Sequence, residues 1–277
     1  MKVLFLGTSS GAGKTTVTAL YCRYLNQKGV KVAPFKASNL SMTSLVTKDG
    51  GEIGIGQAFQ AWASGTEPSG EMNPILIRPS GKGKMQLIVN GKLREEISDK
   101  NPIDTEAVRK EAYGSFDRLS KKYDAVVCEG SGSPVELNLM ERDIANIGLM
   151  RGRNVPAILV GDIERGGVFA ALYGTWLLMP KDVRPLLKGF IINRFRGDPS
   201  ILEPAIKKIE DLTGMKFIGT IPYVDLKFPE EDSLSEITGI TDYRASTEYF
   251  IKNADSLLRT AKEYGLDLKK IEDISSS

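Results

Sequence analysis

The first fifteen residues constrain the fold of this chain more than any other segment. A short apolar run at Lys2–Leu6 predicts a buried strand, and a glycine- and serine-rich turn follows it before Lys14 and Thr15 open a helical pattern. Backbone N–H groups in such a turn can surround phosphate oxygens, and the positive end of the following helix adds to the attraction. Strand, loop, Lys-Thr pair and helix in this order predict a site for the phosphates of a nucleotide.

The loop residues have distinct expected roles. Lys14 would reach the β- and γ-phosphates, and the Thr15 hydroxyl would offer an oxygen to Mg²⁺. The first glycine, Gly7, comes one residue earlier than in the common form of this motif. A strand–helix turn without a ligand is the alternative interpretation. We predict that ATP and Mg²⁺ bind through the following loop residues: Thr8, Ser9, Ser10, Gly11, Ala12, Gly13, Lys14, Thr15 and Thr16.

The composition narrows the classes of function. The chain has 277 residues, a net charge of +2 and 41% hydrophobic residues, which suits one large α/β domain with or without an appendage. The weak charge gives no basic field for nucleic acid, and no apolar run reaches the length of a membrane span. We therefore expect no nucleic-acid partner and no membrane. Two cysteines, Cys22 and Cys128, are too few for a disulfide framework and indicate a reducing cytoplasm.

The sequence contains no histidine, which excludes mechanisms and metal sites that need an imidazole from this chain. A Ser–His or Cys–His catalytic pair is excluded within this chain, and so is a zinc site built with imidazole. Proton transfer must therefore depend on carboxylates, lysines, water or the substrate.

Strand-like and helix-like stretches alternate along most of the chain, as in repeated βαβ units. The pattern predicts a doubly wound, mostly parallel sheet whose ligand crevice lies at the carboxyl ends of its strands. The predicted strands are Lys2–Leu6, Val30–Phe35, Ala125–Cys128, Ala157–Val160, Gly189–Ile192 and Lys216–Thr220. The predicted helices between them are Thr15–Gln27, Glu52–Ala63, Thr105–Lys121, Gly167–Leu178 and Pro199–Thr213.

Two regions depart from this alternation. Residues 75–92 are predicted to form a β-ribbon that covers the site. The strand signal weakens near residue 234, so we divide the chain into a synthetase domain at 1–234 and a helical extension at 235–277 packed on it. From this boundary onward, 234–243 is predicted as a loop, 248–263 as a helix, and 266–271 as a short piece that could prolong that helix.

Several longer stretches resemble the cobyric acid synthase family, the glutamine-dependent corrinoid amide synthetases. The resemblance runs from residue 1 to about residue 234 and depends on segments such as Ala33-Pro-Phe-Lys-Ala-Ser-Asn39, Asp49-Gly-Gly-Glu-Ile-Gly54 and Gly161-Asp-Ile-Glu-Arg-Gly-Gly-Val-Phe169. It implies a dethiobiotin synthetase-like P-loop NTPase fold. It also implies ATP-dependent amidation of side-chain carboxylates of (adenosyl)cobyrinic acid a,c-diamide to cobyric acid, through an acyl phosphate that ammonia attacks.

Acidic and basic residues at strand ends supply candidates for this chemistry. Glu129 ends a buried apolar strand beside the loop, where a carboxylate can hold Mg²⁺; the alternative is a helix-capping carboxylate. Asp49 or Glu52 is the expected second acidic metal ligand, and the sequence does not choose between them. Lys36, at the end of the second strand, is predicted to face the transferred phosphoryl group or the substrate carboxylate. Lys14, Lys36, Glu129 and Asp143 form the predicted catalytic group.

The remaining candidates are predicted to contact the substrate or the base. Asp143 and Glu136 follow Glu129 in an acidic loop and could position a substrate arm or ammonia, or bind a second metal, with a solvated surface as the alternative. Asn193 ends a strand where its amide could pair with the adenine edge. Pro222 is predicted to complete the purine pocket, and the residues assigned to the substrate are Ser38, Asn39, Glu136, Asp162 and Arg165.

The source of ammonia departs from the family pattern. The family's usual form continues into a glutamine-hydrolysing domain that needs a cysteine and a histidine, and this chain has no histidine. We therefore expect ammonia from a separate glutaminase subunit or from free ammonium, with a corrinoid as the small-molecule partner, and we leave a homodimer open. The rival interpretations are another synthetase of the same branch, such as the a,c-diamide synthetase or dethiobiotin synthetase, and a regulatory ATP-binding module without catalysis.

Overall fold

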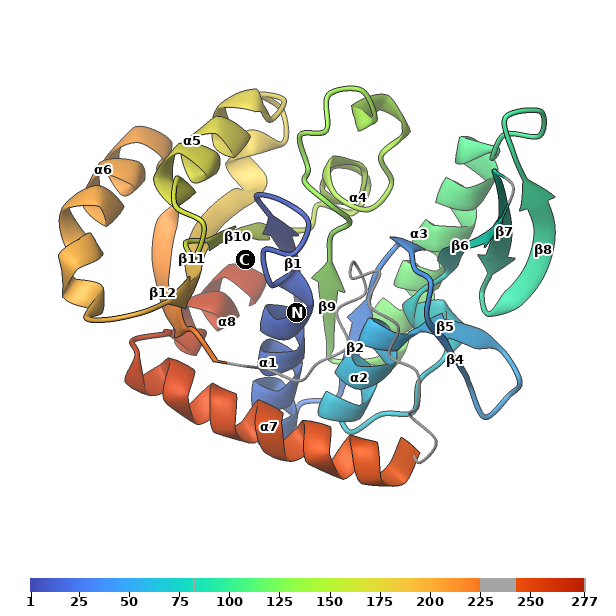
Figure 1. The fold of residues 1–277 in the computed structure, drawn as a ribbon, viewed down its shortest axis with the longest axis horizontal. Coiled ribbons are helices and arrows are strands. Elements are labelled where there is room, and N and C mark those ends of the chain that lie inside the picture. The colour runs from blue at the N-terminus through green and yellow to red at the C-terminus, as the bar shows by residue number, and fades with distance from the viewer. Residues whose placement is uncertain (82, 225–242, 277) are drawn as a thin grey trace.

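A parallel β-sheet forms the centre of the molecule (Figure 1). The computed structural model describes residues 1–81, 83–224 and 243–276. Within these residues the central sheet has the strand order β12-β11-β10-β1-β9-β2, and every neighbouring pair is parallel. Its strands are β1 (Lys2–Gly7), β2 (Val32–Phe35), β9 (Ala125–Glu129), β10 (Ala157–Asp162), β11 (Leu187–Phe195) and β12 (Lys216–Pro222).

The sheet is buried on both faces, which explains why its strands are apolar without alternation. In β1, Val3 and Phe5 belong to one hydrophobic cluster, whereas Leu4 and Leu6 belong to the other. Successive side chains of a strand point to opposite faces, so a run of apolar residues serves both cores. The doubly wound parallel fold predicted from the sequence is confirmed.

Helices cover the two faces of the sheet. Helices α1 and α8 and part of α7 pack in one cluster, whereas α2 to α6 contribute to the other. None of the described helices is both long and apolar enough to cross a membrane. The helices are α1 (Lys14–Gln27), α2 (Ile55–Ala63), α3 (Thr105–Lys122), α4 (Ile147–Arg153), α5 (Val168–Leu178), α6 (Glu203–Thr213), α7 (Tyr243–Glu263) and α8 (Leu268–Ser276).

A smaller sheet lies beside the central one, on the side of β2 (Figure 1). It has the order β3-β6-β7-β8, in which β3 and β6 are parallel and the other pairs are antiparallel. The ribbon predicted at residues 75–92 corresponds to β6 and β7. The strands of this sheet and of an adjoining hairpin are β3 (Ser38–Leu40), β6 (Ile75–Gly81), β7 (Lys84–Val89) and β8 (Lys92–Ile97), with β4 (Ser44–Val46) and β5 (Glu52–Gly54).

The structure corrects two predicted helix starts. The helix expected from Pro199 begins as an α-helix only at Glu203, because Pro199–Leu202 forms a 3-10 turn. The helix expected from Glu52 begins at Ile55, because Glu52–Gly54 forms β5 and Gly54 has an extended backbone, with φ −57° and ψ 140°. The last predicted piece is a separate helix, α8, rather than a continuation of α7. The proposed boundary between residues 234 and 235, and most of the predicted loop at 234–243, lie outside the described residues.

Helix α7 packs across α1 and α2, along the lower side of the molecule in Figure 1. The Phe250 ring stacks on Phe59 of α2, with 4.5 Å between ring centroids. On α1, the Arg23 guanidinium donates to both carboxylate oxygens of Asp255, at 2.6 and 3.0 Å. These contacts attach α7 to both α2 and the phosphate-loop helix α1.

Replacing Phe250 with leucine is expected to lower the free energy of unfolding by about 1–2 kcal/mol, because the substitution removes a buried stacked ring pair. Chemical denaturation measures the change. Its neighbour Tyr249 is half-exposed and supplies the matched control, since Tyr249→Leu should stay within about 0.5 kcal/mol of the wild type. Equal effects of the two substitutions would contradict the described packing of α7.

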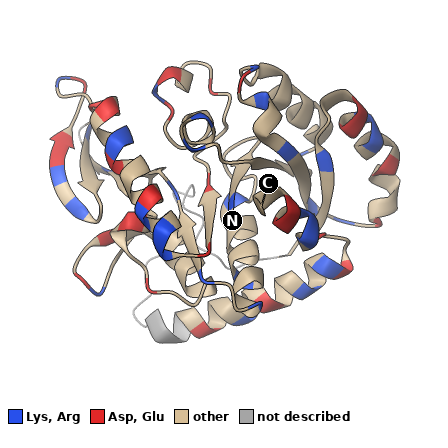
Figure 2. Cartoon of the chain, turned by 180° about the vertical axis from the view of Figure 1, so that it is seen from behind, with Lys and Arg blue, Asp and Glu red and all other residues tan. Residues whose placement is uncertain are grey.

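Charged residues of both signs are interleaved along the outer helices (Figure 2). Helix α3 illustrates the pattern: it begins with Asp104 accepting from the backbone N–H groups of Glu106 and Ala107, and ends with Lys121 and Lys122. Acidic groups at the start and basic groups at the end both interact favourably with the helix dipole. This mixture agrees with the small net charge of the chain.

Candidate nucleotide and phosphoryl-transfer site

The turn after β1 has a backbone that glycine favours. Gly13 has φ 98°, and a Cβ built there would lie 2.0 Å from the Nδ2 atom of Asn193. Both the left-handed conformation and the close approach therefore favour glycine at this position. Helix α1 begins directly after it, at Lys14, so the first N–H groups of the helix face the loop.

Neighbouring strands hold the loop. The Thr8 N–H donates to the Val160 carbonyl on β10 at 3.0 Å, and the Asn193 side-chain amide on β11 donates to the Ala12 carbonyl at 2.9 Å. Within the loop, the Lys14 ammonium donates to the Ser9 carbonyl at 3.1 Å. The cation expected to meet the phosphates is thus already held inside the turn.

Glu129 lies at the carboxyl end of β9, immediately beside the loop. Its Oε1 accepts from the Thr15 hydroxyl at 2.9 Å and from the Lys36 ammonium at 3.0 Å. Only 1% of the Glu129 side chain and 5% of the Lys36 side chain are exposed. The structure therefore brings together Thr15, Lys36 and Glu129, which the sequence placed on three separate elements.

The charges around Glu129 keep it ionised. Burial opposes ionisation of this carboxyl, but the positive charges of Lys36 and Lys14 and the Gln60 hydrogen bond outweigh burial and hold its pKa below the ordinary value. An ionised carboxylate in a buried cluster of lysines can ligate a cation and helps to fix the lysines in place.

The residues present fit a magnesium ion bound together with phosphates. Mg²⁺ takes ligands at roughly 2.0–2.1 Å in an octahedron, so two adjacent ligand oxygens lie about 2.9 Å apart. The Thr15 hydroxyl and Glu129 Oε1 are separated by that distance, 2.9 Å. No group of three or more Asp, Glu or Cys residues gathers into a metal site in the described part of the chain, and a site completed by phosphates and water does not need one.

The two candidates for a second acidic ligand make their contacts elsewhere. Glu52 accepts from Arg78 at 2.6 Å and from the Ser44 hydroxyl at 3.0 Å. Asp49 is exposed in the β4–β5 turn and accepts from the Thr47 hydroxyl. These contacts give a structural reason for each carboxylate, and a metal role for either one remains a prediction.

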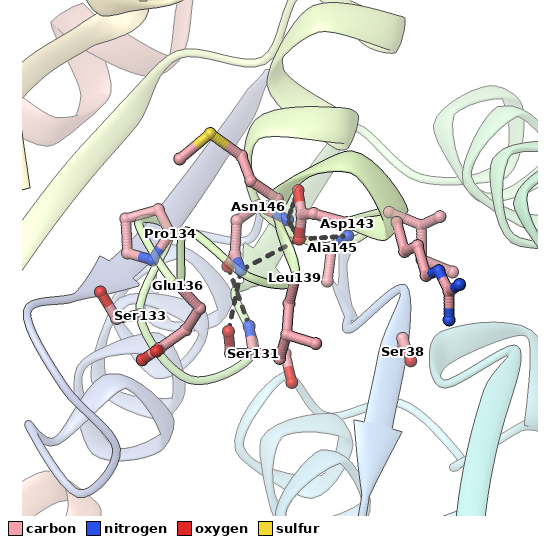
Figure 3. A pocket seen from close by; sticks show the side chains of 12 residues that line it. Ser38, Ser131, Ser133, Pro134, Glu136, Leu139, Asp143, Ala145 and Asn146 are labelled. Atoms are coloured by element: carbon pink, nitrogen blue, oxygen red, sulfur yellow. Dashed lines mark hydrogen bonds between the residues drawn. The ribbon is translucent and has the colours of Figure 1, made fainter. Parts of the chain in front are cut away.

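The loop after β9 supplies most of the lining of a cavity of about 230 Å³ (Figure 3). The loop that lines it approaches the phosphate loop, since a Cβ built at Gly132, between the lining residues Ser131 and Ser133, would lie 3.9 Å from the Ser10 hydroxyl. The lining combines hydroxyl, amide, charged and apolar side chains. It consists of Ser38, Ser131, Ser133, Pro134, Glu136, Leu139, Met140, Arg142, Asp143, Ile144, Ala145 and Asn146.

Asp143 lines this cavity, but its carboxylate is occupied by the start of α4. It accepts from the backbone N–H groups of Ala145, Asn146 and Gly148 at 3.3, 3.0 and 2.7 Å, and from the Asn146 amide at 3.1 Å. Burial raises its pKa above the ordinary value, while these donors act in the opposite direction. The geometry supports a capping role, and a catalytic role for Asp143 remains a prediction.

Two predicted substrate residues are neighbours on β3 with different surroundings. Ser38 lines the cavity, as does Glu136 from the opposite loop. Asn39 is buried and donates to Gln57 on α2 at 3.1 Å. Of these three, Ser38 and Glu136 are therefore placed to contact a ligand in the cavity.

The other predicted residues belong to β10, β11 and β12, except Arg165, which follows β10. Asp162 accepts from Arg194 at 2.8 Å, and Arg165 is exposed. Asn193 contacts the phosphate loop through Ala12, and Pro222 is buried at the end of β12 opposite Phe195. Their predicted contacts with substrate and base remain predictions.

The sequence assigned no role to two glutamines that the structure places on Glu129. Gln57 and Gln60 of α2 both donate to its Oε2, at 3.3 and 2.5 Å. A signal was available: two amides three residues apart in an otherwise apolar helix share one face, and a buried polar face needs a polar partner.

Comparisons with known proteins agree with this geometry. The CbiA family model, described as the CobQ/CobB/MinD/ParA nucleotide binding domain, matches residues 3–234. A probable cobyric acid synthase of Methanoculleus marisnigri is 47% identical over 85% of this chain and 48% of its own length. Those of Methanosarcina acetivorans and Archaeoglobus fulgidus are 49% and 46% identical, over 84% and 83% of this chain and 48% and 50% of their own lengths.

These matches confirm the resemblance seen in the sequence, and the chain spans about half the length of the curated relatives it matches. The family model covers β1, the phosphate loop with Lys14 and Thr15, the end of β9 with Glu129, and the rest of the central sheet. With most of its length and its whole nucleotide site inside that match, the chain belongs to the CobQ/CobB/MinD/ParA nucleotide-binding domain family.

Proposed function

We propose that this protein is an ATP- and Mg²⁺-dependent amide synthetase that converts side-chain carboxylates of (adenosyl)cobyrinic acid a,c-diamide into amides, giving cobyric acid. The observation that carries the proposal is the cluster of Lys14, Thr15, Lys36 and Glu129, in which both lysines and the carboxylate are buried, together with the cavity lined by the loop after β9. The names of the curated relatives supply the substrate class.

The proposed reaction has two steps. A substrate carboxylate oxygen attacks the γ-phosphorus of ATP, the bond to the β-phosphate oxygen breaks, and ADP leaves. Ammonia then attacks the carbonyl carbon of the acyl phosphate, the C–O bond to phosphate breaks, and the surplus proton of the nitrogen passes to water or phosphate. Such phosphoryl transfer depends mainly on positioning and charge neutralisation.

The residues of this chain have specific parts in that scheme. Lys14 begins α1 at the end of the loop, where it can bind the terminal phosphates. Lys36 follows β2 and contacts Glu129, where its charge can meet the transferred group or the attacking carboxylate. Thr15 and Glu129 would hold Mg²⁺, which supplies neutralising charge on the phosphates when bound. Lys14, Lys36 and Glu129 are buried, which keeps water from weakening these electrostatic interactions.

The size of the cavity supports a substrate that enters by one arm. Pockets that enclose a whole drug-sized ligand have volumes of roughly 300–1,000 Å³. The cavity here measures about 230 Å³, and the loop that lines it approaches the phosphate loop. It suits a single carboxylate-bearing side chain better than a complete macrocycle.

The proposal also covers the source of ammonia and the cellular compartment. Ammonia would come from a separate glutaminase subunit or from free ammonium, because the chain holds no histidine for a Cys–His glutaminase. Both cysteines, Cys22 and Cys128, are free and buried, which supports a reducing cytoplasm. A homodimer is compatible with this scheme.

Amidation by the purified protein tests the proposal. With ATP, Mg²⁺, ammonium and cobyrinic acid a,c-diamide, mass spectrometry should detect amidated products, and one ADP should form per amide. Glutamine in place of ammonium should give no product unless a glutaminase is added.

Two controls make the result decisive. ATP turnover should depend on the corrinoid, and diaminopelargonic acid should not replace it. Binding of ATP without any amidation would contradict the proposal and favour the regulatory alternative. Amidation supported by glutamine alone would contradict the proposed ammonia source.

A further inference from the structure

Helix α2 presents two buried amide side chains to the Glu129 carboxylate. Gln57 and Gln60 are three residues apart, so they share one face of the helix, and neither is exposed to solvent. Both are uncharged and hydrogen-bond to a carboxylate, and neither lines the cavity. Any effect on the reaction must therefore pass through the groups that they hold.

The four described donors to Glu129 are divided between its two oxygens. The Gln60 amide donates to Oε2 at 2.5 Å, and the Gln57 amide donates to the same oxygen at 3.3 Å. Oε1 accepts from Thr15 and Lys36. With Oε2 bound from α2, Oε1 is the oxygen directed to the phosphate loop.

Gln60 also reaches the other expected cation ligand. Its amide lies 3.4 Å from the backbone carbonyl of Thr15, in the first turn of α1. One side chain thus contacts both the strand that ends in Glu129 and the helix that carries the Thr15 hydroxyl. Because its donors carry no charge, it orients the carboxylate without adding a third cation to Lys14 and Lys36.

Gln57 supports this arrangement from the other side. Its own carbonyl oxygen accepts from Asn39 at 3.1 Å, which fixes the direction of the amide toward Glu129. Outer groups of this kind commonly tune a metal site, because they fix the orientation of the ligands that touch the ion.

We propose that Gln60, assisted by Gln57, is a positioning residue that sets the orientation of Glu129 relative to Thr15 and so determines how tightly Mg²⁺ is held with the nucleotide. The inference rests on the proposed binding of ATP with Mg²⁺, and it does not depend on which acid is amidated.

The test compares ATP binding with and without Mg²⁺ by calorimetry, in wild type and in Gln60→Leu. In Gln60→Leu we expect a rise of about 10-fold or more in the Mg²⁺ concentration that gives half of the full increase in ATP affinity. A change of this size is the usual consequence of removing an outer-shell partner. Affinity for ATP without Mg²⁺ should stay within about twofold, since the loop and Lys14 are untouched.

Two further variants complete the design. Gln57→Leu removes the longer contact and should give a smaller shift in the same direction, which keeps the inference testable if Gln60→Leu does not fold. Gln27→Leu is the matched control, because Gln27 is exposed at the far end of α1 and contacts Asp255. It should leave the Mg²⁺ dependence unchanged.

An unchanged Mg²⁺ dependence in folded Gln60→Leu would overturn the inference. An equal loss of ATP affinity with and without Mg²⁺ would also overturn it, because it would indicate general damage to the loop. Both readouts omit the corrinoid, so failure of the amidation assay and failure of this inference are distinguishable.

Discussion

Replacing Lys14 with alanine should lower ATP turnover by on the order of 10²–10³-fold, the usual effect of removing a preplaced donor to developing charge. The Lys14 side chain is buried, and its ammonium is already held against the Ser9 carbonyl inside the loop. No other described residue places a cation in that position within the turn, so a neighbouring side chain should not compensate. Phosphate release and ATP binding measure the loss.

A surface lysine provides the control for this substitution. The Lys48 side chain is 81% exposed and pairs with Glu67 on the surface, so Lys48→Ala should leave both readouts unchanged. If folded Lys14→Ala kept wild-type turnover, the turn after β1 would not be the phosphate site, and the proposed function would lose its basis.

Replacing Glu129 with alanine should affect both catalysis and stability. The change removes the carboxylate between Lys36 and Lys14 and leaves buried positive charge without its partner, which costs about 3–5 kcal/mol in the free energy of unfolding. It also removes an expected Mg²⁺ ligand, so turnover should fall by on the order of 10²-fold or more. Denaturant unfolding and phosphate release measure the two effects.

The pH dependence of the free energy of unfolding distinguishes the contribution of the Glu129 charge from that of its side-chain size. The folded-state pKa of Glu129 lies below the ordinary value, so its stabilising contribution is present above the ordinary pKa and is lost as the pH falls through the lowered one. Glu129→Gln keeps the size of the side chain but cannot ionise, so it should reduce the loss of stability that accompanies the fall in pH. Glu67→Ala, on the surface, should leave that pH dependence unchanged.

A stable Glu129→Ala variant with full turnover would contradict the described cluster.

The sequence predicted the central sheet closely because of how that sheet is buried. Strands enclosed on both faces consist of short continuous apolar runs, such as Ala125-Val-Val-Cys128, and these runs are visible without any knowledge of the fold. All six predicted strands occur in the sheet, and several extend further toward the ligand edge.

The shorter elements could not be predicted in the same way. Strand β3 has the sequence Ser-Asn-Leu, and it is a strand because it pairs with β6, more than thirty residues later. Helix α4 has only seven residues and follows a long loop whose Asp143 caps it. Such elements depend on partners distant in sequence, which local patterns do not contain.

In the candidate site, too, some contacts could be predicted from the sequence and others could not. Thr15, Lys36 and Glu129 were predictable, because the carboxyl ends of neighbouring parallel strands meet at one edge of a sheet. The partners of Glu52 and Asp49 were not, since these two carboxylates belong to the β4–β5 hairpin, which the sequence did not reveal. Gln57 and Gln60 escaped notice because an amide shows its role only when its carboxylate partner is in place.

The position of α7 has a consequence for the chain as a whole. This helix lies across α1 and α2, and those two helices carry Thr15 and Gln60 respectively. No described side chain of α7 lines the cavity, but its contacts with both α1 and α2 link these two helices to each other. The segment from residue 243 onward therefore contributes to the site indirectly. A variant that ends before this segment would lose the contacts of α7 with α1 and α2, and its affinity for the nucleotide should fall.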